Sequence, residues 1–380
     1  MLSVSFRRLE LHKLYPLAIS RGVQATSENL FVEVSDGTYT GIGELSPATA
    51  SQWTAERGET QLREFIKPFE WAALDKPKAQ SVALQILSGL ANPHGRPEAD
   101  AARGTYVSPH KAWQLMKDAQ IDPPAMAALD SAIWDLLAKR ARMPLFELLG
   151  LENRQVPTSI TIGLNPPEVT KERVPDILQR TGAKCLKIKL GSPEGREFDK
   201  AHFSAAAEAA KPFNAKLRVD ANGGWTVDEA KMMMAWLAPQ GVDYVEQPLV
   251  EGAEADLPLI FENRPLPIFV DEGCRFSQDI PKWAHTVDGI NLKLMKCGGI
   301  TEALRIVSTA RAFGLKTMIG CMSESSIAIA AGAAMGSLFD YIDLDSHLNL
   351  KPDPATGAPI VDGVITPNDL PGHGASLRDA

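Results

Sequence analysis

Four short stretches decide the fold of this 380-residue chain: CLKIKL at 185–190, LRVDANGGW at 217–225, YVEQP at 244–248 and IFVDE at 268–272. Each contains a run of apolar, largely β-favouring residues and also carries charged side chains, mostly where that run ends. Stretches rich in Ala, Glu and Lys, which are typical of helices, separate them. The alternation predicts repeated βα units, in which strands run parallel and helices connect them.

The same pattern extends on both sides of these stretches, so that eight β-rich runs are present. They occupy residues 159–162, 185–190, 217–220, 244–245, 268–270, 290–294, 317–319 and 341–344. Eight βα units in roughly 200 residues favour a closed parallel (β/α)8 barrel of the α/β class over an open sheet.

The first 120 residues have a different character. Residues 30–34 form an apolar run, Ser35-Asp36-Gly37 is a turn signal, and residues 39–44 resume an extended pattern. These features predict a hairpin, which is followed by helical composition around residues 60–66. A polar stretch with Pro and Gly at 92–109 interrupts the pattern. We therefore predict a small α+β domain over residues 1–120.

The barrel is predicted to occupy residues 121–350. It opens with an amphipathic helix, because apolar residues from Met126 to Leu137 recur at helical spacing. The tail, residues 351–380, is rich in Pro, Gly and Asp and is expected to pack back on the first domain.

Composition excludes some classes of function. The net charge is -8 and the pI is about 5.5, which argues against a nucleic-acid partner. No signal peptide is recognised, and the longest apolar run, 327–339, is too short to span a membrane. The four cysteines form no CxxC pair. We expect reduced thiols, a cytoplasmic protein and no membrane partner.

Three carboxylates follow one another at successive predicted strand ends. Asp220 and Glu246 are 26 residues apart, and Glu246 and Asp271 are 25 residues apart, which is one βα unit in each case. Neighbouring strands of a barrel therefore deliver the three side chains to one place. Carboxylates so close repel one another unless a cation neutralises them, and all-oxygen ligation suits Mg2+. The sequence predicts one Mg2+ held by these residues.

Lysines are predicted to face the same barrel mouth. Lys187 and Lys189 are two residues apart on one strand and so point to one side. Lys293 lies on the sixth strand, across the barrel. We expect Lys189 and Lys293 to act as acid and base, with Lys187 and the metal lowering the pKa of Lys189. Mg2+ and a lysine base suit removal of a proton next to a carboxylate through an enediolate.

Several motifs carry a resemblance to a known family: ALDSAIWDL at 128–136, PLFELLG at 144–150, LKIKLG at 186–191, DANGGW at 220–225, VEQP at 245–248, Asp271-Glu272, and NLKLMKCGG at 291–299. The chain resembles the enolase superfamily and, within it, the muconate-lactonizing-enzyme subgroup, over nearly its whole length. The resemblance implies a capping domain built from both chain ends. It disfavours the mandelate-racemase variant, because no histidine lies near the end of the sixth or seventh predicted strand.

The eighth predicted strand ends in Asp343-Leu344-Asp345, which bears on the substrate. Two inward carboxylates would bind the free ammonium of a dipeptide, whereas they would be a penalty for muconate or succinylbenzoate. The pair resembles the Asp-x-Asp of dipeptide epimerases, and residues 320–325 resemble their strand-seven loop. We expect a dipeptide epimerase. Alternatives are N-acylamino acid racemases, o-succinylbenzoate synthases and cycloisomerases of the same subgroup, and a Schiff-base barrel aldolase.

The resemblance also implies substrate contacts from Lys187, Thr161, Cys321 and Ser323, and it implies a homo-oligomer. Arg21 lies where Ala-Glu epimerases carry an arginine for the substrate's Glu side chain. Ser323 replaces the bulkier residue of some of those enzymes, so the sequence leaves the dipeptide's side chains open. His347 is expected to cap the barrel mouth rather than to act in catalysis.

Overall fold

A three-stranded antiparallel sheet begins the chain, in a computed structural model that describes residues 2–49, 51–71, 108–154 and 156–378. Its strands, in sheet order, are β1 (Ser3–Ile19), β2 (Gly22–Ser35) and β3 (Thr40–Leu45). Four helices follow: α1 (Ala55–Trp71), α4 (Pro109–Asp118), α5 (Pro123–Ala141) and α6 (Leu145–Leu148). Most of the polar stretch at 92–109 lies outside the described residues.

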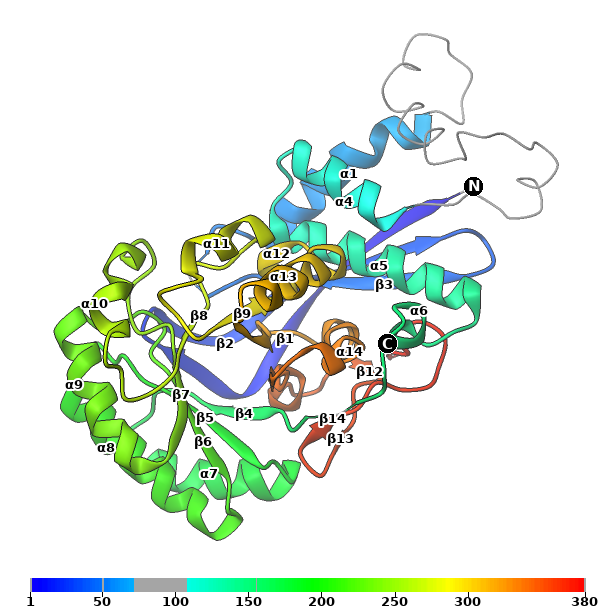
Figure 1. The fold of residues 1–380 in the computed structure, drawn as a ribbon. Helices are drawn as coiled ribbons and strands as arrows, with labels where there is room; N and C mark the ends of the chain where they lie inside the picture. Colours follow the sequence, from blue (N-terminus) through cyan, green and yellow to red (C-terminus); the bar gives the residue numbers. More distant parts are fainter. Residues whose placement is uncertain (1, 50, 72–107, 155, 379–380) are drawn as a thin grey trace.

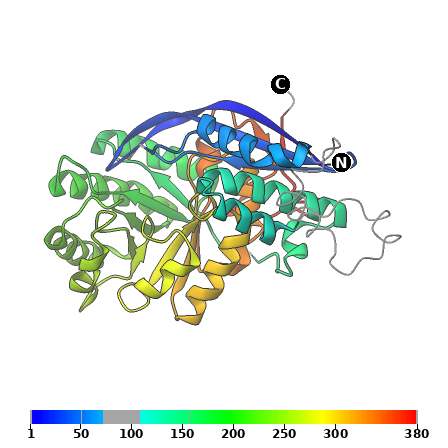
Figure 2. The ribbon, with the colours of Figure 1, turned by 90° about the horizontal axis from the view of Figure 1, so that it is seen from above.

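The predicted hairpin is confirmed as β2 and β3, but β1 was not predicted. Its first half does alternate, with Val4 and Phe6 half-buried between exposed neighbours. Adjacent Arg7 and Arg8 are both exposed and break this period, which hides the strand in the sequence. β1 is long enough to carry the hairpin tip over one side of the barrel, as the blue strands show (Figures 1 and 2).

Eight parallel strands form the second sheet and confirm the (β/α)8 prediction. Their sheet order follows the chain, and an isolated parallel bridge between Thr158 and Ile342 joins the first strand to the last. The strands are β4 (Ser159–Ile162), β5 (Cys185–Lys189), β6 (Lys216–Asp220), β7 (Val242–Glu246), β8 (Ile268–Val270), β9 (Gly289–Lys293), β10 (Lys316–Gly320) and β11 (Tyr341–Asp343). Their ends lie within three residues of the predicted runs.

Helices connect these strands and cover the barrel from outside (Figure 1). They are α7 (Pro167–Thr181), α8 (Arg196–Ala210), α9 (Val227–Leu237), α10 (Leu257–Phe261), α11 (Ile280–Trp283), α12 (Leu294–Cys297), α13 (Ile300–Ala312) and α14 (Ser326–Ala333). The apolar run at 327–339 is buried here: a Cβ on Gly332 would lie 3.2 Å from Leu344. In the described part of the chain, no helix is both long and apolar enough to cross a bilayer.

The tail contacts both parts of the molecule. The Lys351 amide donates to the His12 carbonyl at 2.8 Å, and His373 Nε2 lies 2.9 Å from the Ile42 carbonyl of β3. On the barrel side, His347 Nε2 lies 2.8 Å from the Ala358 carbonyl, so this histidine fastens the tail. Four two-residue strands complete it: β12 (Ala355–Thr356), β13 (Ile360–Val361), β14 (Val364–Ile365) and β15 (Ser376–Leu377).

Helix α5 packs directly on the first sheet, although it lies beyond residue 120. Two glycines of β3 allow this close approach. A Cβ on Gly41 would lie 2.1 Å from the Ala132 carbonyl oxygen, and one on Gly43 would lie 2.0 Å from that of Ala128. The division of domains at residue 120 stays a proposal, and α5 shares its core with β2 and β3.

We predict that Gly43→Ala destabilises the protein, because the new methyl group meets helix backbone that cannot move aside. Overpacking of this kind costs about 1–3 kcal/mol, measured as a lower midpoint of urea or thermal unfolding. Gly336→Ala is the control, since its Cβ meets the flexible end of Ile342 at 3.3 Å. An equal loss in both variants would contradict the close-approach argument.

Candidate active site at the barrel mouth

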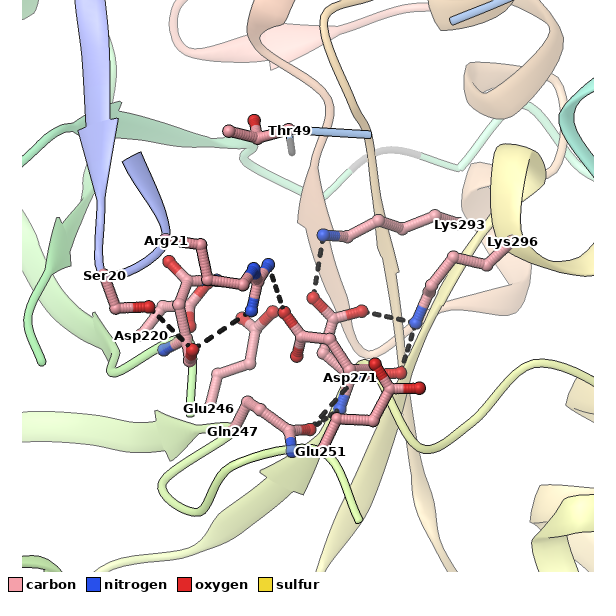
Figure 3. Close-up of polar contacts among 12 residues, drawn as sticks. Ser20, Arg21, Thr49, Asp220, Glu246, Gln247, Glu251, Asp271, Lys293 and Lys296 are labelled. Atoms are coloured by element: carbon pink, nitrogen blue, oxygen red, sulfur yellow. Dashed lines mark hydrogen bonds and ion pairs between the residues drawn. The ribbon is translucent and has the colours of Figure 1, made fainter. Parts of the chain in front are cut away.

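Three buried carboxylates meet at the carboxyl ends of neighbouring barrel strands. Asp220 ends β6, Glu246 ends β7 and Asp271 follows β8. Each offers an oxygen atom, and these oxygens all lie within 4.8 Å of one another. The three carboxylates that are evenly spaced in the sequence therefore form one cluster in the structure (Figure 3).

Lysines surround this cluster from two sides. Lys187 Nζ lies 2.7 Å from Glu246, 3.3 Å from Asp220 and 2.7 Å from Asp343, with no exposed surface. Lys189 Nζ lies 2.5 Å from Asp220, and Lys293 Nζ lies 2.7 Å from Asp271. Lys187 and Lys189 share one face of β5, as expected from their spacing.

The carboxylates differ in protonation because their lysine neighbours differ. Burial by itself raises the pKa of Asp220, but Lys189 and Lys187 outweigh it and hold that pKa at about 2. Burial is likewise outweighed at Asp271, whose pKa falls well below its usual range beside Lys293 and Lys296. Burial and the neighbouring Asp220 raise the pKa of Glu246 to about 8. A divalent cation bound by the three carboxylates would lower the pKa of Glu246 and favour its ionised form.

Two of the lysines at the barrel mouth have raised pKa values, whereas the lower pKa expected of the base Lys189 beside the metal stays a prediction. The pKa of Lys293 is raised: burial lowers it, and the Asp271, Glu246 and Glu272 carboxylates outweigh that burial. Carboxylates also outweigh burial at Lys187 and raise its pKa. The physical reason is that each of these ammonium groups lies against carboxylates, so neutralising the carboxylates would lower the pKa of both lysines.

Three further residues hold the side chains or backbone of this cluster and were not assigned a role from the sequence. The buried Lys296 ammonium contacts Asp271 Oδ1 and also donates to the Asn291 carbonyl at 3.0 Å. Asn291 Nδ2 donates to Glu246 at 2.7 Å, and Gln247 Oε1 accepts from the Asp271 amide at 2.8 Å. All three lie in the motifs quoted above. A polar residue within such a motif, next to a predicted strand end, is the feature of the sequence that could have indicated their role.

A cavity of about 370 Å³ opens beside this cluster. Of the predicted site residues, six line it: Arg21, Lys189, Asp271, Lys293, Cys321 and Ser323. Its other walls come partly from the first sheet and the segment after it, including Leu17, Ile19, Pro47 and Trp53. The barrel therefore supplies most of the charged groups, and the N-terminal part supplies much of the apolar wall.

Arg21 lies at the hairpin tip between β1 and β2 and reaches the cavity, but it is already paired. Its guanidinium lies 2.7 Å from Glu272 and donates to the Asn222 carbonyl at 3.1 Å. Burial lowers the pKa of Arg21, and Glu272 more than offsets this. An arginine neutralised in this way offers little free charge to a substrate carboxylate (Figure 3).

The two aspartates of the Asp-x-Asp motif, Asp343 and Asp345, lie in different environments. Asp343 is buried and pairs with Lys187, although its Oδ1 has no hydrogen-bond partner among the described residues. Asp345 is half-buried and accepts from the Thr161 amide at 2.6 Å. Burial and the neighbouring Asp343 raise the pKa of Asp345 to about 6. Both carboxylates would gain from a nearby cation.

The loop after β10 is held in place by the first sheet. Asn29 Nδ2 donates to the Ser323 carbonyl at 2.7 Å. Glu44 accepts from Ser325 Oγ at 2.7 Å and from the Ala328 amide at 3.2 Å, at the N-terminus of α14. Burial raises the pKa of Glu44 to about 7 despite these hydrogen bonds. The position of Cys321 and Ser323 thus depends on β2 and β3.

Comparisons with known proteins agree with this geometry. Residues 170–380 match the family model described as enolase C-terminal domain-like, and residues 107–150 match the mandelate racemase / muconate lactonizing enzyme N-terminal domain. A protein of Roseobacter litoralis named hydrophobic dipeptide epimerase is 52% identical over 100% of both chains. One of the same name from a Flavobacteria bacterium is 51% identical over 99% of this chain and 98% of its own.

Among solved structures, the dipeptide epimerase of Enterococcus faecalis in complex with Mg and L-Leu-L-Tyr matches with a TM-score of 0.80. It is 29% identical, and the match covers 98% of each chain. A substrate-liganded L-Ala-D/L-Glu epimerase from Bacillus subtilis matches with a TM-score of 0.81 at 26% identity, again over 98% of each chain. Fold, charged cluster and full-length relatives agree, and the chain belongs to the mandelate racemase / muconate lactonizing enzyme family of the enolase superfamily.

Proposed function

We propose that this protein is a Mg2+-dependent dipeptide epimerase, which inverts the α-carbon of the C-terminal residue by 1,1-proton transfer. The observation that carries the proposal is the placement of Lys189 and Lys293. They end strands β5 and β9, contact different carboxylates of one cluster, and line one cavity. The full-length relatives named dipeptide epimerases support the choice of substrate.

Asp220, Glu246 and Asp271 would hold the Mg2+, because their buried oxygens converge within 4.8 Å of one another and all-oxygen ligation suits this cation. When bound, Mg2+ supplies positive charge to the oxygens of the developing enediolate. One lysine removes the α-proton, and the lysine opposite delivers a proton to the other face. Their roles exchange when the opposite stereoisomer is the substrate.

Asp343 and Asp345 would bind the ammonium group of the dipeptide. Asp345 is the accessible member of the pair, with an oxygen directed by the Thr161 amide. Lys187 would hold the carboxylate of Asp343 in place, because the two groups are 2.7 Å apart. Cys321 lies 3.7 Å from Asp345. It would contact the part of the peptide that lies between the Asp343–Asp345 pair and the two catalytic lysines.

We propose further that the C-terminal side chain is uncharged and mainly apolar. Arg21 pairs with Glu272, and Arg275 pairs with Glu251, so these two arginines of the cavity wall are neutralised within the chain. Leu17, Ile19, Trp53 and Met322 supply apolar surface between them. The printed name of the relatives, hydrophobic dipeptide epimerase, supports the same class.

We also propose a cytoplasmic homo-oligomer. The four cysteines, Cys185, Cys274, Cys297 and Cys321, are free thiols, which supports a reducing compartment. The oligomer is an expectation from the family, and sedimentation velocity of the purified protein tests it.

The assignment of the two lysines predicts that their variants lose inversion of the α-carbon but keep exchange of the α-proton with solvent. In D2O, the wild-type protein should incorporate deuterium at the α-carbon and invert L-Ala-L-Leu. Lys189→Ala and Lys293→Ala should each reduce inversion at least 10²–10⁴-fold, the usual contribution of a general base. Each should still exchange the α-proton of one stereoisomer, because the remaining lysine can remove and return it on one face.

Mass spectrometry and chiral chromatography read the two events separately. The two variants should exchange opposite stereoisomers, L-Ala-L-Leu in one case and L-Ala-D-Leu in the other. Exchange of the same stereoisomer by both variants would sink the two-base assignment. Absence of exchange and inversion with every dipeptide in the wild-type protein would sink the proposed function.

The metal assignment predicts ligand-dependent stability. Mg2+ at a hundredfold excess over its Kd should stabilise the protein by about 2.7 kcal/mol, seen as a higher Tm. Glu246→Gln should remove this shift, because it deletes a ligand charge. Glu251→Gln is the control, since Glu251 lines the same cavity but pairs with Arg275. A full Mg2+ shift in Glu246→Gln would refute the assignment.

The paired arginines predict the substrate range. Measured kcat/KM for L-Ala-L-Leu and L-Ala-L-Phe should exceed that for L-Ala-L-Glu by about tenfold or more, because a buried carboxylate would lack a free counter-ion. The assay follows loss of the L,L stereoisomer at saturating Mg2+. Equal or faster turnover of L-Ala-L-Glu would show that Arg21 leaves Glu272 for the substrate.

A further inference from the structure

One lysine beside the cavity has no role in the mechanism above. β1 leaves its register with β2 between His12 and Leu17, and this irregular segment carries Lys13 onto the barrel. The Lys13 ammonium donates to Ser323 Oγ at 2.6 Å and to Gln24 Oε1 at 3.1 Å. Gln24 and Ser323 both line the cavity, so Lys13 stands directly behind its wall.

The charge of Lys13 is uncompensated, unlike that of the cavity cations. Arg21, Lys189, Lys293, Lys296 and Arg275 each have a carboxylate oxygen within 4.0 Å. Across the described ranges of the chain, Lys13 has none, and two hydrogen bonds leave one of its three donors unused. Burial lowers the pKa of Lys13 to about 8, as expected for an ammonium without a counter-ion.

Lys13 lies near the place where the N-terminal residue of the proposed dipeptide would bind. Lys13 bridges to Leu350, just after the Asp-x-Asp segment, and its partner Ser323 is two residues from Cys321. Cys321 in turn lies 3.7 Å from Asp345, the proposed contact of the substrate ammonium. A side chain on the ammonium-bearing carbon therefore lies close to this group of residues.

Asp345 itself lines a space much smaller than the main cavity. Asp345 and Thr161 line a crevice of about 30 Å³, which suffices for about one water molecule. Tyr15 and Leu348 close it further. The larger space is the main cavity, which is lined by Cys321 and Ser323 and has the Lys13 ammonium behind its wall.

We propose that Lys13, together with Gln24 and Ser323, forms a subsite for the N-terminal side chain of the dipeptide and selects side chains that carry a hydrogen-bond acceptor, Glu and Gln above all. The proposal rests on the dipeptide epimerase function proposed above. It concerns the first residue of the substrate, whereas the paired arginines concern the second. Lys13 is thereby a specificity-determining residue rather than a catalytic one.

The test compares three dipeptides of matched length: L-Glu-L-Leu, L-Gln-L-Leu and L-Met-L-Leu. For the wild-type protein, kcat/KM for the first two should exceed that for L-Met-L-Leu by about tenfold or more, the size of one hydrogen bond to a charged group. Lys13→Met should bring both ratios close to one. Lys13→Arg, which retains the charge, should keep most of the preference.

Lys171→Met is the matched control, because Lys171 is an exposed lysine of α7 and its loss changes net charge equally. The control should keep the wild-type ratios. A uniform loss for all three dipeptides in Lys13→Met, with unchanged ratios, would overturn the subsite and leave Lys13 as a support for the loop. Wild-type ratios near one would overturn it too, even if Lys13→Met fails to fold. L-Ala-L-Leu separates the two proposals, since its turnover by the wild-type protein keeps the epimerase function whatever the ratios are.

Discussion

The rest of the site depends on a buried network of opposite charges centred on Lys187. This ammonium has no exposed surface and contacts three carboxylates that come from β6, β7 and β11. Ions inside a protein are tolerated only when they are paired, so each strand end must deliver its partner for the others to remain charged. The network therefore couples one half of the barrel to the other across its axis.

The register of the parallel strands places the charged side chains at the same height along the barrel axis. Lys189 is paired with Asp220 in the β5–β6 ladder, and Asp220 with Glu246 in the β6–β7 ladder. A shift of one residue in either ladder would turn a charge from the barrel interior toward the helices. Apolar neighbours such as Ile188 and Val219 are fully buried, and burying them fixes the register against that shift.

Much of this arrangement could be predicted from the sequence because it is periodic. Eight β-rich runs, and three carboxylates spaced 26 and 25 residues apart at successive strand ends, define a barrel and a carboxylate cluster without any knowledge of distant contacts. The predicted positions of Asp220, Glu246 and Asp271 rest on strand spacing alone. The (β/α)8 architecture was confirmed for the same reason.

What the sequence could not provide was the partner of each charge across long separations. Lys187 and Asp343 are 156 residues apart, and Arg21 meets Glu272 across the junction of two sheets. No local pattern encodes such pairs, because they depend on where the hairpin of β1 and β2 lies on the barrel. The same limit hid Lys13, whose strand was itself masked by adjacent exposed arginines.

The cavity walls come from two different segments of the chain, and this bears on how substrate specificity can change in evolution. The charged cluster stands on barrel strands, whereas Leu17, Ile19, Gln24 and Trp53 belong to the hairpin and the segment that follows it. A duplicated gene can therefore acquire a new substrate by substitutions in the first 53 residues while the ionic network stays unchanged. The proton-transfer chemistry can thus be retained while the substrate changes, provided that the contacts of Asn29 and Glu44 with the loop after β10 are kept.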